Sequence, residues 1–196
     1  RFMKQVFRDM RALKTMLEDD WFETDIMRIG AEQELCMVDP HGKAFPRSME
    51  VLEKLGDGNY TTEFARFNLE INMDPLEFSG DALSHLEHNL HSEMQHVRNT
   101  VRDLGGDILL TGILPTIRKM DLDIKNLTPL QRYEALCKAI NKLRGKEFEL
   151  RIQGMDELLM KFDSPLLEAC NTGFQVHLQV KPSEFVNRYN VAQAVT

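Results

Sequence analysis

The stretch from Ile29 to Asp39 constrains the fold most, because with a period of two it separates into two faces of opposite chemistry. One face is apolar, and the other carries Glu32 and Glu34. Alternate strand residues lie roughly 7 Å apart on the same side, so the two carboxylates repel each other. Two interpretations remain open. The pair binds cations, since hard divalent ions take carboxylate oxygens, or it lies on the solvated face of an edge strand.

A second stretch, from Tyr60 to Met73, also reads as extended structure with alternating chemistry. Glu70 lies on its polar side between two asparagines, opposite the side of Leu69 and Ile71. Glu63 comes seven residues before Glu70 and therefore has the opposite parity, unless a bulge or bend intervenes. The stretch thus predicts a second strand with a carboxylate on its polar face.

A third stretch, from Gly173 to Val180, alternates as cleanly and places His177 between two glutamines on its polar face. None of the three polar faces contains a lysine, although solvated strand faces commonly carry one. Several carboxylates without counter-cations raise one another's pKa and oppose folding, and divalent cations would relieve this. Oxygen-rich ligation with one histidine favours Mg²⁺ or Mn²⁺. The candidate ligands at this stage are Glu32, Glu34, Glu70 and His177.

The remaining chain predicts helices and short strands around these three stretches. Apolar steps of three and four residues predict helices over 2–20, 49–55, 79–104 and 128–143, and a last one after Pro182. Thr128 is the expected N-cap of the fourth helix, with Pro129 at its first position. Further strands are expected at 107–111 and 148–153, a long polar connection at 112–127, and mixed helix and loop at 155–169. We therefore predict an α+β fold.

The helix over 79–104 is rich in histidine, which suggests a metal site. Its leucine and valine stripe argues against one, because the histidines fall beside or opposite that stripe. We therefore assign them to the solvated face. They are His85, His88, His91 and His96.

Charge and cysteine usage limit the partners and the compartment. The net charge of -7 argues against nucleic acid or an anionic membrane as the main partner. The three cysteines are widely spaced and lie in apolar patterns, which predicts free, buried thiols and a reducing cytoplasm.

Four segments of the chain carry a family resemblance, and they span roughly residues 29–180. In their order and approximate spacing, the chain resembles the glutamate-cysteine ligase family and its bacterial carboxylate-amine ligase relatives. The segments are Gly30–Leu35, Thr61–Phe64 continuing to Leu69–Ile71, Gln131–Tyr133 and Gly173–Leu178.

The resemblance implies a glutamine-synthetase-like catalytic fold, with a curved, largely antiparallel sheet that holds ATP and Mg²⁺ or Mn²⁺ and has helices on its outer face. Family members are about twice this length. Residues 1–196 are therefore expected to be the N-terminal part of a single catalytic domain whose C-terminal half is absent, and to be inactive alone. Exposed strand edges then make association into a homo-oligomer an expectation.

The resemblance also assigns roles to individual residues. By position, the metal ligands match Glu32, Glu34, Glu63, Glu70 and His177. Arg132 and Tyr133 are similar to a pair near the substrate pocket of the family. Many relatives carry a Gly-x-His-Pro type segment after the long helix, whereas here Thr111–Thr116 lacks the histidine, which leaves the acid and amine substrates open.

The implied activity is that of a cytoplasmic ligase of glutathione biosynthesis: ATP phosphorylates the carboxylate of one amino acid, and an amine then attacks the acyl phosphate to form an amide. Two other functions stay open. The chain could be a non-catalytic metal- or nucleotide-binding module of the same fold, or a metal-dependent hydrolase that uses the same carboxylates without ATP.

Overall fold

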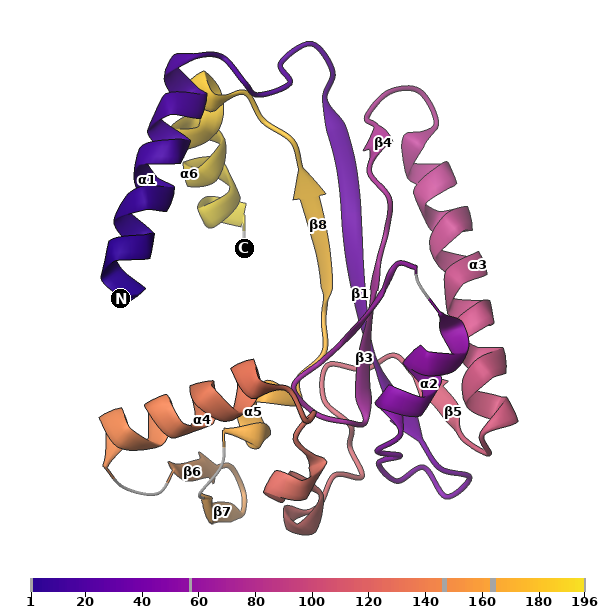
Figure 1. Cartoon of the computed structure of the whole chain (residues 1–196). Helices are drawn as coiled ribbons and strands as arrows, with labels where there is room; N and C mark the ends of the chain where they lie inside the picture. The colour runs from indigo at the N-terminus through magenta and orange to yellow at the C-terminus, as the bar shows by residue number, and fades with distance from the viewer. Residues whose placement is uncertain (1, 57, 146–147, 163–164, 196) are drawn as a thin grey trace.

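The structure is a computed structural model that describes residues 2–56, 58–145, 148–162 and 165–195 (Figure 1). Its centre is one long strand, β1 (Arg28–Val38), in a sheet of six strands. Four strands pair antiparallel with β1, and β2 (Tyr60–Thr62) pairs antiparallel with one of these four. The four are β3 (Asn68–Asn72), β4 (Leu76–Glu77), β5 (Asp107–Leu109) and β8 (Phe174–Leu178).

The apolar face of β1 and β3 forms the main core with two helices, α2 (Ser48–Leu55) and α3 (Ala82–Asp103). Leu35 and Ile71 of the sheet and Val97 of α3 are fully buried there. Both helices lie on the same side of the sheet in Figure 1. The opposite, polar face of the sheet is therefore left free of these helices.

A second core lies below the end of the sheet and joins the β2–β3 connection to later elements. These elements are η1 (Lys119–Leu122), η2 (Ile124–Asn126), α4 (Gln131–Arg144), the hairpin of β6 (Phe148–Gln153) with β7 (Glu157–Phe162), and α5 (Leu166–Ala169). Phe67 and Leu166 are fully buried in this core. It fixes the loop in which Glu63 lies.

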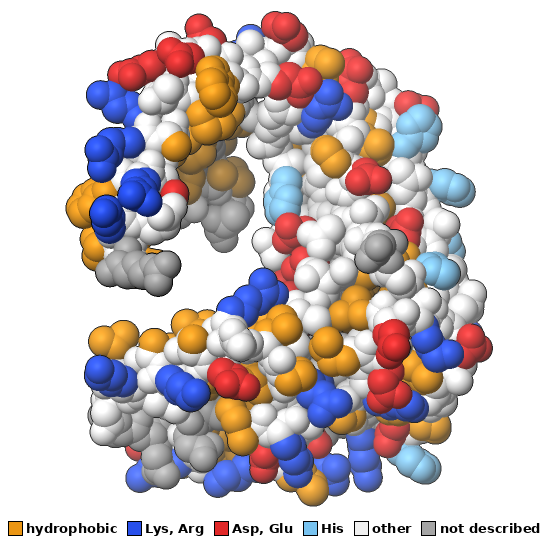
Figure 2. Space-filling view, viewed as in Figure 1, with side chains coloured by type: hydrophobic (Ala, Val, Ile, Leu, Met, Phe, Trp, Pro, Cys, Tyr) orange, Lys and Arg blue, Asp and Glu red, His pale blue; other side chains and the backbone are white. Residues whose placement is uncertain are grey.

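The two ends of the described chain form helices that bury no residue. They are α1 (Phe2–Glu18), and α6 (Phe185–Val195) preceded by η3 (Pro182–Glu184). The expected apolar stripe of α1 is present but exposed. Figure 2 shows a wide notch between the arm that carries α1 and α6 and the arm that carries α4, with acidic side chains and a histidine on its inner wall.

The structure confirms the predicted α+β class, the largely antiparallel sheet and the helices on its outer face. The sheet is open, and β8 has no second neighbour among the described strands, so the expected association of copies stays a prediction. The four histidines of α3 are exposed as expected, but Leu83, which was assigned to the buried stripe, is 60% exposed. All three cysteines are free and buried, as predicted.

The region 155–169 was predicted as helix and loop, and that prediction was wrong for β7, which is a strand. The chain turns back after Gln153, where the Gly154 amide donates to the Asp156 carbonyl (2.9 Å), and β7 then pairs with β6 along its whole length. Long-range pairing decided the structure of a segment whose local pattern was ambiguous. Residues 163–164 of this region lie outside the described residues.

Thr128 is not the N-cap of α4, contrary to prediction, because the helix begins at Gln131 with Leu130 as its cap. The Thr128 side chain is fully buried and donates its hydroxyl hydrogen bond to the Glu63 carbonyl (2.6 Å). The Thr128 hydroxyl thus serves a tertiary contact, and α4 begins further along the chain, at Gln131.

Candidate metal centre

Two carboxylates of the candidate site face each other across the β1–β3 pair. The register places Glu34 directly opposite Glu70, and Glu32 opposite Asn72. Like charges in such cross-strand pairs are destabilising. A cation between Glu34 and Glu70 would offset this repulsion in the middle of the sheet.

Glu63 reaches the same place from the loop that directly follows β2. The predicted single stretch from Tyr60 to Met73 is in fact two strands, β2 and β3, joined by a chain reversal. Thr61 is opposite Glu70, and Glu63 lies two residues further on the same side. The reversal therefore removes the parity conflict, and Thr128 holds it by donating its amide hydrogen to Phe64 (2.9 Å) as well as its hydroxyl to Glu63.

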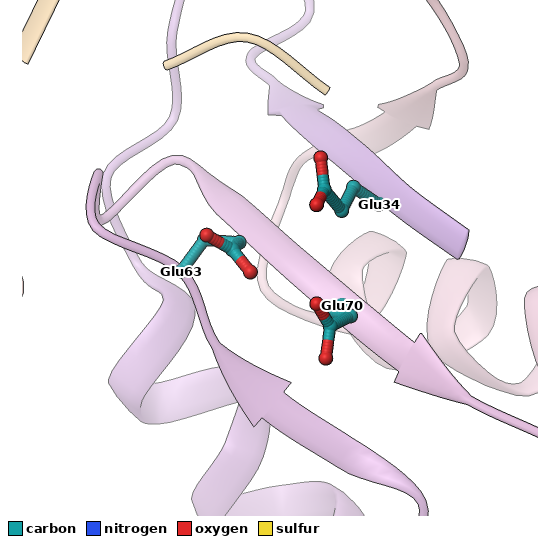
Figure 3. Close-up of side chains that lie close together, drawn as sticks. All are labelled: Glu34, Glu63 and Glu70. Atoms are coloured by element: carbon teal, nitrogen blue, oxygen red, sulfur yellow. The ribbon is translucent and has the colours of Figure 1, made fainter. Parts of the chain in front are cut away.

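The three carboxylates converge (Figure 3): one oxygen each from Glu34, Glu63 and Glu70 lie within 4.8 Å of one another. All three side chains are half-buried, so a cation could enter from solvent. A donor set of three carboxylates suits a hard cation such as Mg²⁺ or Mn²⁺ and lacks the sulfur and nitrogen ligands typical of zinc.

The acidic triad of Glu34, Glu63 and Glu70 is held by uncharged hydrogen-bond donors. Glu34 accepts from the Gly173 amide (2.8 Å) and the Gln175 side chain (3.2 Å), and Glu70 accepts from the Asn72 side chain (2.9 Å). No lysine or arginine among the described residues forms an ion pair with the triad. These donors orient the oxygens without neutralising their charge.

Glu63 shows the electrostatic consequence of this arrangement. Burial, and next the negative charges of Glu34 and Glu70, raise the pKa of Glu63 from 4.5 to about 7. A bound cation would act in the opposite direction and favour the charged carboxylate. The centre has the electrostatics of a site that binds positive charge.

The other two predicted ligands, Glu32 and His177, form a neighbouring pair on the same face. His177 Nε2 lies 3.5 Å from Glu32 Oε1, and β8 places His177 opposite Gly30. The structure therefore divides the five predicted ligands into the triad and this pair. Strand periodicity put Glu32, Glu34, Glu70 and His177 on polar faces, but only the sheet register separates the triad from the pair.

Arg132 and Tyr133 lie on the first turn of α4, beside the strand that leads to Glu63. The Tyr133 hydroxyl donates to the Thr62 carbonyl (3.2 Å), and its ring packs on Phe64 with a centroid distance of 4.8 Å. The Arg132 guanidinium lies 4.7 Å from the centroid of the Tyr133 ring and is exposed. The pair is thus next to the triad, while its role in substrate binding stays a prediction.

Sequence reasoning missed the Gly173 amide as a partner of Glu34, and no local pattern could have revealed it. Gln175 and Asn72 were recognised only as members of the polar faces. Two other polar residues are used elsewhere: Arg28 forms an ion pair with Glu23 (2.8 Å), and Gln179 also donates to Glu23. Neither supplies the triad with a partner.

Comparison with protein families gives a match over most of the chain. A family model described as glutamate-cysteine ligase family 2 matches residues 28–196, which include the whole sheet and both groups of candidate ligands. No curated protein and no solved structure matches the chain significantly. Within the part of the chain that the structure describes, no helix has the length and apolar character that a membrane span requires. By the family match, which covers most of its length, the chain belongs to glutamate-cysteine ligase family 2.

Proposed function

We propose that this protein is an ATP- and Mg²⁺- or Mn²⁺-dependent carboxylate-amine ligase of the glutamate-cysteine ligase type. The observation that supports it most is the convergence of Glu34, Glu63 and Glu70, with no counter-cation among the described residues, in a chain of this family. Three carboxylates without a positive partner are costly for folding alone and suit a centre that binds a metal-nucleotide complex.

The proposed reaction has two steps. A carboxylate oxygen of the acid substrate attacks the γ-phosphorus of ATP and releases ADP, which gives an acyl phosphate. The amine then attacks the acyl carbon, the carbon–oxygen bond to phosphate breaks, and an amide, inorganic phosphate and a proton result. When bound, a divalent cation would neutralise the phosphoryl oxygens.

The residues of this chain would position the reactants. Glu34, Glu63 and Glu70 would hold one cation, with Glu34 oriented by Gly173 and Gln175. Glu32 and His177 would hold a further cation beside it, since they lie together on the same face. Arg132, exposed beside the strand that leads to Glu63, would bind a carboxylate of an amino-acid substrate.

The test is an assay of phosphate release by the full-length protein with ATP, Mg²⁺, glutamate and a panel of amines including cysteine. We expect release that requires both the acid and the amine. Glu34→Gln should reduce it strongly, whereas Glu87→Gln, which removes a carboxylate from the exposed face of α3, should leave it unchanged.

The alternatives give different results in the same assay. Phosphate release without an amine would indicate a hydrolase. Metal and nucleotide binding with no release for any pair of substrates would indicate a non-catalytic binding module. Either result would refute the ligase proposal.

A further inference from the structure

A groove of about 470 Å³ lies outside the metal centre, between α4, η2 and the loop that follows Glu63. Its volume falls in the range of small-molecule sites. None of the five candidate metal ligands lines it. A ligand in this groove would therefore bind independently of the triad and of the Glu32–His177 pair.

Three cations from three separate segments line the groove: Arg66, Lys125 and Lys138. Arg66 comes from the loop after β2, Lys125 from η2, and Lys138 from α4. The chain as a whole carries a net charge of -7. The described lining of this groove has more cations than acids, so its local charge is opposite in sign to that of the chain. Such a grouping attracts anions.

Arg66 has unused hydrogen-bonding capacity. Its Nε is buried and has no hydrogen-bond partner among the described residues. Its Nη1 donates only a long hydrogen bond, 3.5 Å, to the Lys125 carbonyl. Nε is shielded from solvent, so a ligand in the groove would contact the exposed end of the guanidinium, which is the side of Nη1. An oxyanion is the partner that a guanidinium matches best.

The acids near the groove leave most of this positive charge available. Glu134 is the one acid among the described lining residues, and it lies 4.0 Å from Lys138 in an exposed pair. Glu50, whose pKa is lowered by Arg47 first and by Arg66 to a smaller degree, is held by its hydrogen bonds to Arg47. Arg66 and Lys125 thus lack a carboxylate partner of their own among the described contacts.

Apart from Asn141, the rest of the described lining is apolar and includes Ile124 and Leu127. Apolar walls next to a few convergent cations are the usual composition of a site for an organic anion. Inorganic phosphate alone would leave these walls uncovered.

We propose that this groove binds a small phosphorylated organic molecule. Its phosphoryl oxygens contact Arg66, Lys125 and Lys138, and its apolar part packs on Ile124 and Leu127. A phosphoryl group matches the three cations better than a carboxylate does, since it offers more oxygens and more negative charge.

The test is calorimetric titration of the protein with phenyl phosphate, with EDTA present so that no metal-bridged binding contributes. We expect saturable binding of one equivalent. Inorganic phosphate should bind more weakly because it lacks the apolar part, and benzyl alcohol should not bind because it lacks the charge.

Two matched double variants locate the site. The double variant Lys125→Gln with Lys138→Gln should lower the affinity for phenyl phosphate by about tenfold or more, as expected for the loss of two charge-assisted contacts. Lys54→Gln with Lys119→Gln removes the same charge from surfaces outside the groove and should bind like the parent protein. Both doubles remove lysines from exposed positions, and unchanged thermal unfolding would verify that they fold.

Three results would overturn the proposal. One is the absence of saturable phenyl phosphate binding up to about 10 mM, a concentration above the range of specific sites. The second is an equal loss of affinity in both doubles, which would indicate a nonspecific effect of net charge. The third is tight binding of benzyl alcohol, which would indicate an apolar site only.

Discussion

At the scale of single residues, the candidate centre depends on three carboxylates that uncharged donors orient and that no lysine or arginine in the described part of the chain neutralises. Glu34 has the most defined orientation, because the Gly173 amide and the Gln175 side chain each donate to one of its two oxygens. If the triad binds metal, the charge of Glu34 is required, and an amide of the same shape cannot replace it.

We therefore predict that Glu34→Gln lowers the affinity for Mn²⁺ by more than about tenfold, measured by calorimetry or by the electron paramagnetic resonance of free Mn²⁺. Glu87→Gln on α3 is the control and should retain the parent affinity. Equal Mn²⁺ binding by both variants would mean that Glu34 is not a ligand.

Glu63 gives a prediction on pH dependence. Its folded-state pKa of about 7 lies above its ordinary value of 4.5, so between these values the folded state binds more protons than the unfolded state. The free energy of unfolding of the metal-free protein should then fall as the pH rises from about 4.5 through 7. The half-buried position screens the effect, which we expect to be on the order of 1 kcal/mol.

Urea unfolding at several pH values in EDTA measures this effect. Glu63→Gln should flatten the decrease over that window, and added Mg²⁺ should restore stability at pH 8 in the parent protein. A Glu63→Gln protein with the same pH slope as the parent would show that another group is responsible.

Much of the residue-level site could be predicted from the sequence. Alternation alone put Glu32, Glu34, Glu70 and His177 on the polar faces of their strands, because side-chain direction in a strand is a local property. Glu63 could not be placed by alternation, since its position depends on a chain reversal and on Thr128, 65 residues later. Only the family resemblance pointed to it.

At the scale of elements, the loop between β2 and β3 is held by distant segments, and Thr128 contributes two of these contacts. We predict that Thr128→Val, which keeps the shape but removes the hydroxyl, leaves the Glu63 carbonyl without its 2.6 Å hydrogen bond. The expected loss is about 1–3 kcal/mol of unfolding free energy together with weaker Mn²⁺ binding, measured on the same samples.

Thr100→Val is the matched control, because the Thr100 hydroxyl donates only to the His96 carbonyl within α3. Thr100→Val should lower the unfolding free energy by less than Thr128→Val does, and it should leave Mn²⁺ binding unchanged. If Thr128→Val kept the parent stability and metal affinity, the loop would owe its position to other contacts.

A second element-level prediction concerns Gly106, between α3 and β5. A Cβ at this position would lie 2.8 Å from the Phe45 ring and 2.9 Å from the Val38 carbonyl oxygen, closer than atoms can approach. Gly106→Ala should therefore destabilise the protein by about 1–3 kcal/mol in urea unfolding.

Gly112→Ala is its control, since a Cβ there meets no atom within 4 Å. Its stability should stay close to that of the parent protein. Equal effects of the two alanines would indicate that the α3–β5 turn can relax without cost.

The elements were predicted well where the local apolar periodicity is strong, and poorly where contacts with distant segments decide the structure. The periodicity of 79–104 gave α3 to within a few residues, although its first stripe residue, Leu83, is exposed. The strand β7 was missed because it exists only through pairing with β6. Thr128 and Pro129 had the local signature of a helix start, and a buried tertiary hydrogen bond took precedence.

At the scale of the whole molecule, the polar face of the sheet carries acidic side chains and a histidine on the inner wall of the notch (Figure 2). The helices α2 and α3 cover the other face and leave this wall accessible. This arrangement suits a reaction in which a nucleotide and two small substrates approach one metal centre. In the proposed reaction, a carboxylate would be activated by phosphorylation before the amine attacks.

Phosphorylation of the carboxylate before amine attack is tested most directly by following the oxygen atoms of the acid. The protein is incubated with ATP, Mg²⁺, an amine and an acid substrate, such as glutamate, whose reacting carboxylate carries ¹⁸O, and the inorganic phosphate is analysed by mass spectrometry. An acyl phosphate requires that one carboxylate oxygen leaves with each phosphate, so labelled phosphate is the predicted result. Phosphate released in amine-dependent turnover without ¹⁸O would contradict it.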